Sequence, residues 1–454
     1  MSEHHEQPMT DAKQASESGD SKLSAERQTE LKTAYEANLA AGRAPYAEVR
    51  FMTRNELEWV MHERDWPLKT PNTIPPENPA NLSQSVLRSL DLAGIFLQGA
   101  NLSYTELSLT DLSGADLDYA NLNSSRLYNT NLSDASLYNA SLVDADLRES
   151  TKLIRATMNN VNLTRAKLDY AHLDNVKLWG ANLTDAALSG AELPGANLER
   201  ANLTRANLEY ANLNEANLER ANLNSANLEH ADLGSANLRD AQMDAATVLV
   251  DSTLNMETLV ADTQWNGTPL TRIRWDKLIR LGDERLAREA KTTRLPRETS
   301  SQLYEYAVRA NRQLAVALRG QALNEQADRF AYRAQLCERV ILRRQLRLPR
   351  YFGSLFLDLI SGYGYKPVRS FITYAVVVLA FAAAYFSLGV GSDHALSWNE
   401  AIVISMTAFH GRGFFSSVFQ PGDLQAAVAA VEAFIGLLIE IVFIATFTQR
   451  FFAR

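Results

Sequence analysis

A short segment with two glycines, His410-Gly411-Arg412-Gly413-Phe414, lies between two long apolar stretches near the end of the chain. Glycine adopts backbone conformations closed to other residues, so a Gly-x-Gly segment can direct successive carbonyl oxygens toward one axis. Rings of backbone carbonyls replace the hydration shell of an ion. The second stretch also contains Glu432 and Glu440, and a carboxylate there must face a water-filled cavity or a partner group. The two glutamates therefore predict a polar or water-filled interior near this segment.

Other kinds of chemistry have little support in the sequence. The single cysteine, Cys337, forms no internal disulfide and no Cys-rich metal site, and the seven histidines form no recognisable ligand set. No phosphate-binding loop, dinucleotide fingerprint, zinc spacing or nucleophile elbow is present. We therefore expect no enzyme activity, no catalytic residue, no bound metal and no cofactor other than permeant monovalent ions.

The apolar stretches have the lengths that membrane helices need. No charged side chain occurs in residues 370–392, and a spanning helix requires about 20 apolar residues. The second stretch, 424–449, is interrupted only by the two glutamates. Between them, 398–409 is too short to cross and suits a re-entrant helix. Positive residues flank both stretches on their outer sides, which predicts a multi-pass protein of the cell membrane with both chain ends cytoplasmic: Lys366, Arg369, Arg450 and Arg454.

The order of outer helix, short helix, Gly-x-Gly segment and inner helix resembles the two-span potassium-channel pore module over residues 351–454. Ser361-Gly362-Tyr363-Gly364-Tyr365-Lys366-Pro367 resembles the segment that enters the outer helix in bacterial pentapeptide-repeat channel proteins. The resemblance implies a homo-tetramer in the lipid bilayer. The family's filter is Thr-Val-Gly-Tyr-Gly-Asp, and here only its two glycines are matched. The implied filter and pore residues are Thr407, Phe409, His410, Gly411, Arg412, Gly413 and Phe414.

The charged residues around this implied filter allow several arrangements. Arg412 either forms a ring that repels cations or points behind the filter toward Glu432, Asp423 or Glu400. The second is favoured, because the tyrosine at that family position points away from the axis. Glu440 is expected to line the inner cavity, or else to pair with Arg450 or a headgroup, and His410 either senses pH or braces the filter. Filter support is expected from Glu432 and Asp423.

A different pattern dominates the middle of the chain. Leucine recurs every fifth residue from Leu82 to Leu147, slips by one residue near Glu149, and resumes in fives from Leu153 to Met243 and Val248, giving 34 repeats. A period of five fits neither an α-helix nor a strand. It fits a chain that turns through about a right angle every five residues, with Leu and the preceding Ala inside. The slip predicts a bulged corner near Glu149.

This motif resembles the pentapeptide-repeat family, whose fold is a right-handed quadrilateral parallel β-helix. Four repeats would form each coil, and at about 4.8 Å per coil the repeats would extend about 40 Å. Some family members are acidic rods that resemble duplex DNA, and residues 81–262 carry 24 acidic against 12 basic side chains. Because acids and bases alternate here, the charges are better explained as solubilising. We expect no nucleic-acid partner, although a cytosolic protein partner on the repeats remains possible.

The flanking segments complete a multidomain organisation. The capping-box sequence Thr53 to Glu56 predicts a short helix through His62. Residues 271–350 carry 19 basic and 9 acidic side chains, and Gly320 is expected to separate two helices. The basic end of this segment suits an anionic cytoplasmic leaflet. The expected divisions are a disordered tail (1–30), a helical cap with a Pro-rich linker (31–80), the repeat β-helix (81–262), a basic helical connector (263–350), a membrane-interface segment (351–370) and a two-span pore domain with a re-entrant loop (371–454).

Taken together, these features predict an oligomeric membrane ion channel with a degenerate potassium-channel-like filter and a cytosolic repeat domain. The alternative is a non-conducting, membrane-tethered scaffold whose repeats bind a protein. A soluble DNA mimic is a third possibility, but it would need neither apolar stretch.

Overall fold

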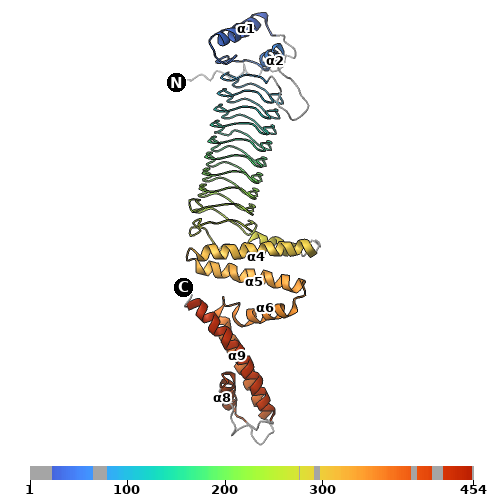
Figure 1. Ribbon diagram of the computed structural model, residues 1–454, viewed down its shortest axis with the longest axis vertical. Helices are drawn as coiled ribbons and strands as arrows, with labels where there is room; N and C mark the ends of the chain where they lie inside the picture. The colour runs from blue at the N-terminus through green and yellow to red at the C-terminus, as the bar shows by residue number, and fades with distance from the viewer. Residues whose placement is uncertain are drawn as a thin grey trace, which may run out of the picture. The chain divides into compact units, whose positions relative to one another are not determined.

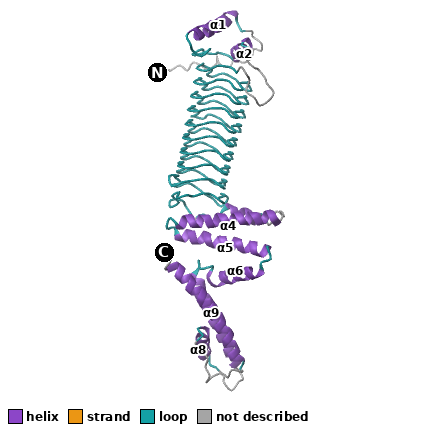
Figure 2. Cartoon of the chain, in the orientation of Figure 1, coloured by secondary structure: helices purple, strands orange, loops and turns teal. Residues whose placement is uncertain are grey.

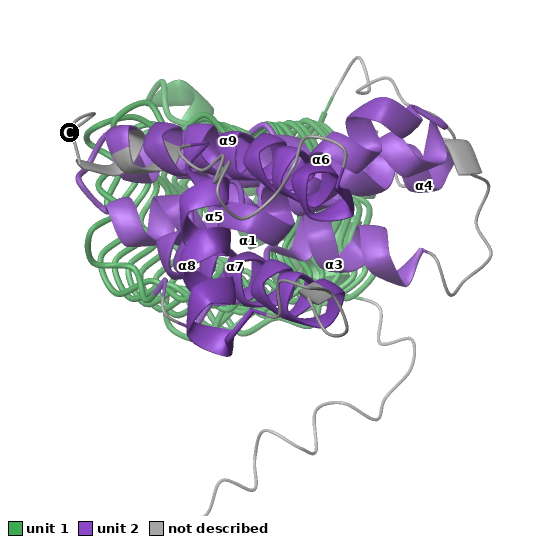
Figure 3. Cartoon of the chain, turned by 90° about the horizontal axis from the view of Figure 1, so that it is seen from below, with its two compact units in different colours: residues 1–258, 263–274 green, residues 259–262, 275–454 purple. Residues whose placement is uncertain are grey.

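The structure, a computed structural model, describes residues 23–64, 79–275, 277–290, 297–389, 396–411 and 423–451. The chain divides into two compact units, shown in different colours in Figure 3. We call residues 1–258 and 263–274 the repeat unit, and residues 259–262 and 275–454 the helical unit. Most of the expected disordered tail and Pro-rich linker lie outside the described residues.

The repeat unit is a stack of coils of twenty residues (Figure 1). Residues twenty apart form parallel bridges, such as Asn101 with Asn121 and Asn202 with Asn222. On each side of a coil only one residue pairs with the neighbouring coil, because the chain turns before a second residue can pair. The described residues therefore contain parallel β-bridges but no extended strand, and the coils are drawn as loops in Figure 2. The four-sided coil is confirmed, whereas continuous strands are absent from this part of the chain.

The interior of each coil follows the sequence pattern. Ala201 and Leu203 are fully buried, and the intervening Asn202 forms the bridge to the next coil. The Leu203 amide donates to the Asn222 carbonyl at 2.8 Å. Two residues after each leucine the backbone has positive φ, as at Arg205 (57°), which turns the chain into the next side. Each buried leucine contributes about 1.5–3 kcal/mol, so the stack holds itself together.

Three register slips interrupt the coils, and after the last of them Gln242 pairs with Gln264, 22 residues away. At the first, Glu149 and Ser150 both have positive φ, and the bridge partners become 21 residues apart, which confirms the bulged corner. A second slip was not predicted. Val248 was expected inside, but it forms a bridge with Asn227 and is half-buried, while Leu249 is buried instead. The extra residue is accommodated in a turn where Asp244 accepts a hydrogen bond from the amide of Ala246.

Two helices precede the coils. Helix α1 (Ala25–Ala40) begins after Ser24, whose side chain accepts a hydrogen bond from the Arg27 amide. The expectation of a disordered tail to residue 30 is therefore wrong for residues 25–30, because this N-cap starts the helix earlier. Helix α2 (Arg54–Glu63) is capped by Thr53 as expected. The Glu56 carboxylate accepts from the Met52 amide, one residue before the usual partner in a capping box.

The helical unit begins with three helices of the connector, α3 (Gly282–Glu289), α4 (Arg297–Arg319) and α5 (Asn324–Arg344). Gly320 lies between α4 and α5, as expected. Residues 259–262 belong to this unit, because buried Asp283 accepts from the amides of Val260 and Ala261 at 2.8 and 3.1 Å. The expected division between residues 262 and 263 therefore differs from the observed one: 259–262 are in the helical unit and 263–274 in the repeat unit.

Four further helices follow. Helix α6 (Leu348–Ser361) ends at Gly362 in the left-handed conformation, and α7 (Pro367–Gly389) starts five residues later. Helix α8 (Trp398–Phe409) has the bounds expected for the short helix, and its N-terminus carries a capping box between Ser397 and Glu400. Helix α9 (Leu424–Phe451) completes the described chain. Helix α8 packs against both α7 and α9.

Candidate functional site

The centre of the α7–α8–α9 bundle is a buried carboxylate. Glu432 on α9 is 0% exposed. The Tyr385 hydroxyl on α7 donates to its Oε2 at 2.8 Å, and the Ser405 hydroxyl on α8 contacts its Oε1. The Ser405 oxygen also lies 2.8 Å from the Val378 carbonyl of α7. One side chain of α9 thus connects all three helices, because a buried carboxylate requires hydrogen-bond donors.

Apolar contacts surround this polar centre on both sides. Toward the N-terminal end of α8, one buried cluster contains Ala382, Tyr385, Ala401 and Ile404. Toward the other end, a second cluster contains Ile360, Val378, Phe409 and Ile439. The orientation of α8 along α7 is fixed by ring contacts at its two ends, Trp398 with Phe386 and Phe409 with Tyr374, whose centroids are 5.6 and 4.9 Å apart.

The C-terminal end of α8 lies against the middle of α9. A Cβ added to Gly436 would overlap the carbonyl oxygen of Phe409, so only glycine permits this approach. Immediately after the helix, His410 Nδ1 contacts Glu440 Oε1 one turn further along α9. Gly411 then has a φ of +64°, with its amide donating to the Ala408 carbonyl at 2.9 Å. The first glycine of the Gly-x-Gly segment therefore ends the helix in the left-handed conformation.

A cavity of about 390 Å³ opens beside the His410–Glu440 pair. Its walls are mostly apolar and aromatic, and the Tyr374 hydroxyl lies 3.4 Å from His410 Nε2. Glu440 is half-exposed and faces this space. The residues lining it are Ser370, Phe371, Tyr374, Phe409, His410, Ile439, Glu440, Phe443 and Ile444.

The structure brings together only part of the site expected from the sequence. His410 and Glu440 meet, and Glu432 lies against α8, where a brace for that helix was expected. Thr407 bonds back to the Val403 carbonyl of its own helix at 2.8 Å. Asp423 lies at the start of α9, where its carbonyl accepts from the Ala426 amide at 3.1 Å. Arg412, Gly413, Phe414 and the Arg450 side chain lie outside the described residues.

The expected partners of Arg412 are largely engaged elsewhere. Glu432 holds Tyr385 and Ser405, and Glu400 accepts from the Ser397 amide at 2.8 Å in the capping box. Sequence reasoning did not identify Tyr385, Ser405 or Gly436. A usable signal was the occurrence of two glutamates in the apolar sequence of α9 and of a serine in that of α8, since a polar group in apolar surroundings requires a polar partner.

A second polar cluster connects the connector to α7. Asp358 on α6 accepts from Arg339 at 2.7 Å and from Tyr332 at 2.9 Å, both on α5, and from Arg369 on α7 at 3.1 Å. Burial alone would raise the pKa of Asp358, but the hydrogen bonds from Arg339 and Tyr332 outweigh it and hold this pKa below its usual value. Asp358 therefore fixes how α6 is rotated between its neighbours.

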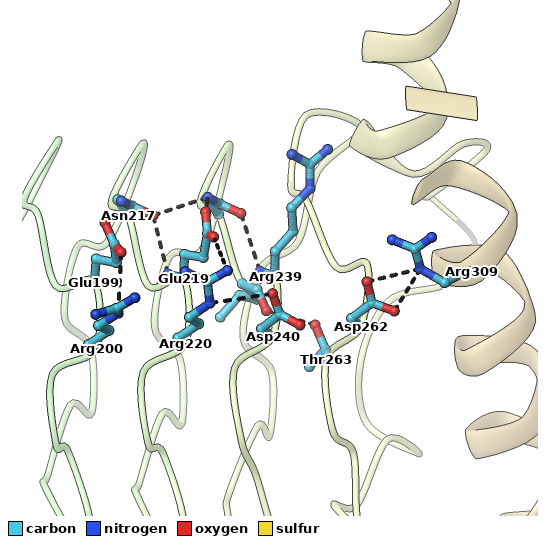
Figure 4. Close-up of polar contacts among 12 residues, drawn as sticks. Glu199, Arg200, Asn217, Glu219, Arg220, Arg239, Asp240, Asp262, Thr263 and Arg309 are labelled. Carbon is cyan, nitrogen blue, oxygen red and sulfur yellow. Dashed lines mark hydrogen bonds and ion pairs between the residues drawn. The ribbon is translucent and has the colours of Figure 1, made fainter. Parts of the chain in front are cut away.

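On the surface of the coils, acidic and basic side chains pair between successive coils. Arg155 bonds Asp134 through two nitrogens, and Arg205 bonds Asp185 in the same way. Figure 4 shows a similar arrangement, in which Arg220 lies between Glu219 of its own coil and Asp240 of the next. At the start of the helical unit, Arg309 of α4 bonds Asp262 at 2.9 Å. These arginines neutralise part of the charge of the acidic side chains on the repeats.

Two helices in the described part of the chain are long and apolar enough to cross a membrane. They are α7 over Pro367–Leu388 and α9 over Leu424–Ala445. In the most apolar window of each, only 17% of the residues are buried. The core helix of a soluble protein would be mostly covered, so these exposed apolar surfaces are compatible with lipid contact.

Comparison with known proteins identifies the repeats. The family described as pentapeptide repeats matches residues 80–118, 115–151, 149–180, 181–220 and 201–240. No curated protein matches the chain. Among solved structures, HetL, a regulator of heterocyst differentiation from the cyanobacterium Nostoc, is 30% identical over 47% of this chain and 98% of its own, with a TM-score of 0.37.

Two further solved proteins match part of the chain. Rfr23 from the cyanobacterium Cyanothece is 32% identical over 27% of this chain and 63% of its own, with a TM-score of 0.15. The plasmid-mediated fluoroquinolone resistance protein QnrB1 is 14% identical over 43% of this chain and 91% of its own, with a TM-score of 0.20. From the family match and the identity to HetL over nearly all of that protein, the chain belongs to the pentapeptide-repeat family.

Proposed function

We propose that several copies of the chain, four in the simplest arrangement, assemble in a cell membrane into a passive ion pore, with the pentapeptide repeats on the cytoplasmic side. Helices α7 and α9 would span the bilayer, and α8 would enter it and return. The proposal assigns no catalytic residue and no resident cofactor. The observation that carries it is the position of the C-terminal end of α8 against the middle of α9, at Gly436.

The depth of α8 supports a re-entrant arrangement. A helix of twelve residues is about 18 Å long, whereas the hydrocarbon core is about 30 Å thick. The ring contacts at its ends place Trp398 beside Phe386, near the end of α7, and Phe409 beside Tyr374, twelve residues earlier. Helix α8 therefore ends inside the bilayer if α7 spans it. Non-helical backbone at that depth requires protein or water around it.

Electrostatics at this end of α8 favours a cation. The last carbonyls of a helix lack intrahelical partners and carry a partial negative charge. Glu440 lies next to them and faces the cavity through its half-exposed side chain. Hydrated monovalent cations are the ligands that such carbonyls and a carboxylate attract.

Flux measurements on the full-length protein in liposomes test the proposal. We expect cation flux down a gradient, and reduced preference for cations over anions in Glu440→Gln. Glu400→Gln is the control, because Glu400 lies at the opposite end of α8 in a capping box. Absence of flux for every monovalent cation and anion, in protein that cross-linking shows to be oligomeric, would reject the pore.

One observation favours the second candidate, a membrane-tethered scaffold. Tyr170 and Tyr210 on the coils are 68% and 60% exposed, although large aromatic side chains usually lie in interfaces or cores. The two tyrosines are forty residues apart in the sequence, so they lie two coils apart on the same side of the stack. If the protein binds a partner there, Tyr170→Ala with Tyr210→Ala will abolish the binding and leave ion flux unchanged.

A further inference from the structure

Helix α6 exposes an apolar stripe immediately before the first membrane-spanning helix. Leu348, Phe352, Leu355 and Leu359 recur at intervals of four, three and four residues, which places them on one face, and all are exposed. We call these four residues the α6 stripe. A soluble helix normally buries such a face, so the stripe requires a partner.

The rotation of α6 that exposes this stripe is fixed by polar contacts on another face. Asp358 bonds Arg339 and Tyr332 of α5, and the Ser354 hydroxyl lies 2.5 Å from that of Tyr363. Because these contacts hold α6 against the connector, the stripe cannot turn inward. Its exposure is a consequence of the fold and not of a loosely attached helix.

The stripe lies at the level of the membrane-spanning part of α7. The Thr373 hydroxyl, six residues into α7, is 3.5 Å from the Leu359 carbonyl. Ile360 belongs to the same buried cluster as Val378 and Ile439 of the two spanning helices. The apolar surface of α6 is thus continuous with that of α7.

Charge at the start of α6 identifies the kind of partner. Arg343, Arg347 and Arg350 are exposed, and within the described residues no carboxylate lies within ion-pair distance of them. Leu346 and Leu348, on either side of Arg347, are also exposed. Arginines next to exposed leucines match the boundary between anionic headgroups and acyl chains.

We propose that α6 lies in the cytoplasmic leaflet, with its stripe in the acyl-chain boundary and Arg347 and Arg350 on the headgroups of anionic phospholipids. The inference rests on the membrane placement of α7 in the proposed function but does not require conduction. It explains why the connector is joined to the pore through Asp358: one side chain holds the membrane-surface helix, the connector and the outer span together.

Spin labels on the full-length protein test this placement. In a Cys337→Ala background, single cysteines replace Leu359 on the stripe, Val376 on α7 and Val316 on α4. Val316 is a matched control, because it and Leu359 are both 70% exposed. In liposomes containing anionic lipid, the label at 359 should collide readily with oxygen and poorly with a water-soluble nickel chelate, as at 376. The label at 316 should show the reverse.

The charge requirement has its own test. A fluorophore at position 359 should be quenched more by brominated phosphatidylglycerol than by brominated phosphatidylcholine. Arg347→Gln with Arg350→Gln should lower that preference by about fivefold for each arginine removed. Lys277→Gln with Arg280→Gln removes the same charge from exposed positions elsewhere in the helical unit and should leave the preference unchanged.

The outcomes separate this inference from the proposed function. Nickel access at 359 with protection at 376 would overturn the placement of α6 and leave α7 in the membrane. Nickel access at both positions would overturn the membrane assignment itself. Low access to both reagents at 359 would mean that a second copy of the chain covers the stripe, and would also overturn the inference.

Discussion

The hydroxyl of Tyr385 on α7 donates a 2.8 Å hydrogen bond to Glu432 on α9, and that carboxylate is completely buried. Ser405 of α8 contacts the other carboxylate oxygen. A buried acceptor with two donors from two different helices fixes the positions of all three helices, because each unmade bond at this depth costs free energy.

Truncation of Glu432 should destabilise the bundle. In Glu432→Ala the Tyr385 hydroxyl loses its acceptor, the Ser405 hydroxyl retains only the Val378 carbonyl, and a cavity remains. We therefore expect the free energy of unfolding to fall by about 2 kcal/mol or more. Glu432→Gln keeps an acceptor and should lose less. The thermal midpoint of the detergent-solubilised protein measures both. Glu440→Ala, a truncation at a half-exposed position of the same helix, is the control. Equal midpoints for the Ala and Gln variants would contradict the role of the hydrogen bonds.

Gly436→Ala should displace α8. Its methyl group would overlap the Phe409 carbonyl, which is backbone and cannot rotate away. We expect a lower thermal midpoint and loss of ion flux. In Gly353→Ala on α6 the new methyl meets no atom within 4 Å. Because alanine favours a helix more than glycine does, the free energy of unfolding of that variant should rise by up to about 1 kcal/mol. Normal flux in Gly436→Ala would show that the close approach of α8 and α9 is not needed for conduction.

The Asp358 cluster should make the junction of α5, α6 and α7 sensitive to acid. The pKa of Asp358 lies below its ordinary value of 3.8. The charged carboxylate therefore contributes fully to the free energy of unfolding above about pH 4, and this contribution is lost as the pH falls through the lowered pKa. At neutral pH, Asp358→Asn should lower the free energy of unfolding by about 2 kcal/mol. The difference in thermal midpoint between wild type and variant should shrink below pH 4.

A control separates this effect from general acid denaturation. Asp328→Asn removes a more exposed partner of Arg319 and should change the midpoint little at any pH. If the gap between wild type and Asp358→Asn stays constant down to pH 3, the carboxylate does not stabilise the junction in its charged form.

Cys337 should be unreactive in the folded protein. Burial raises the pKa of its thiol to about 12, with a smaller contribution from Glu284, so almost no thiolate exists at pH 8. Incubation with a maleimide followed by mass measurement should show no addition until the protein is denatured. A cysteine at the exposed position of Val316, in the Cys337→Ala background, should react readily. Labelling of Cys337 at a comparable rate would mean that α5 is not packed against α3 and α4.

Within the coils, inner and outer positions should respond differently to substitution. Leu203 is fully buried, so Leu203→Ala should cost about 2–5 kcal/mol, depending on how far the coil closes around the cavity. Arg205 is exposed at the turn, and Arg205→Ala should change stability little. Circular dichroism during heating compares the two variants. A similar loss in both would contradict the inward placement of the leucine.

The coils could be predicted because their information is local and repeated. Leucine at every fifth residue fixes the length of each side, and the change of phase between Leu147 and Leu153 reveals the first slip. The second slip was missed at Val248, because it and Leu249 are both apolar and either can occupy an inward position. Only the pairing of Val248 with Asn227 in the previous coil decides which of the two faces inside.

In the helical unit, the apolar lengths of α7 and α9, and the short apolar stretch between them, were enough to predict these two helices and α8. The contacts between the three helices could not be predicted in this way. Glu432 and Glu440 occur in the same apolar stretch, eight residues apart, with nothing local to distinguish them. Tertiary packing buries Glu432 between Tyr385 and Ser405 and leaves Glu440 half-exposed beside His410. Hydrogen-bond donors from other helices decide which carboxylate is covered, and a sequence read along one helix contains no record of them.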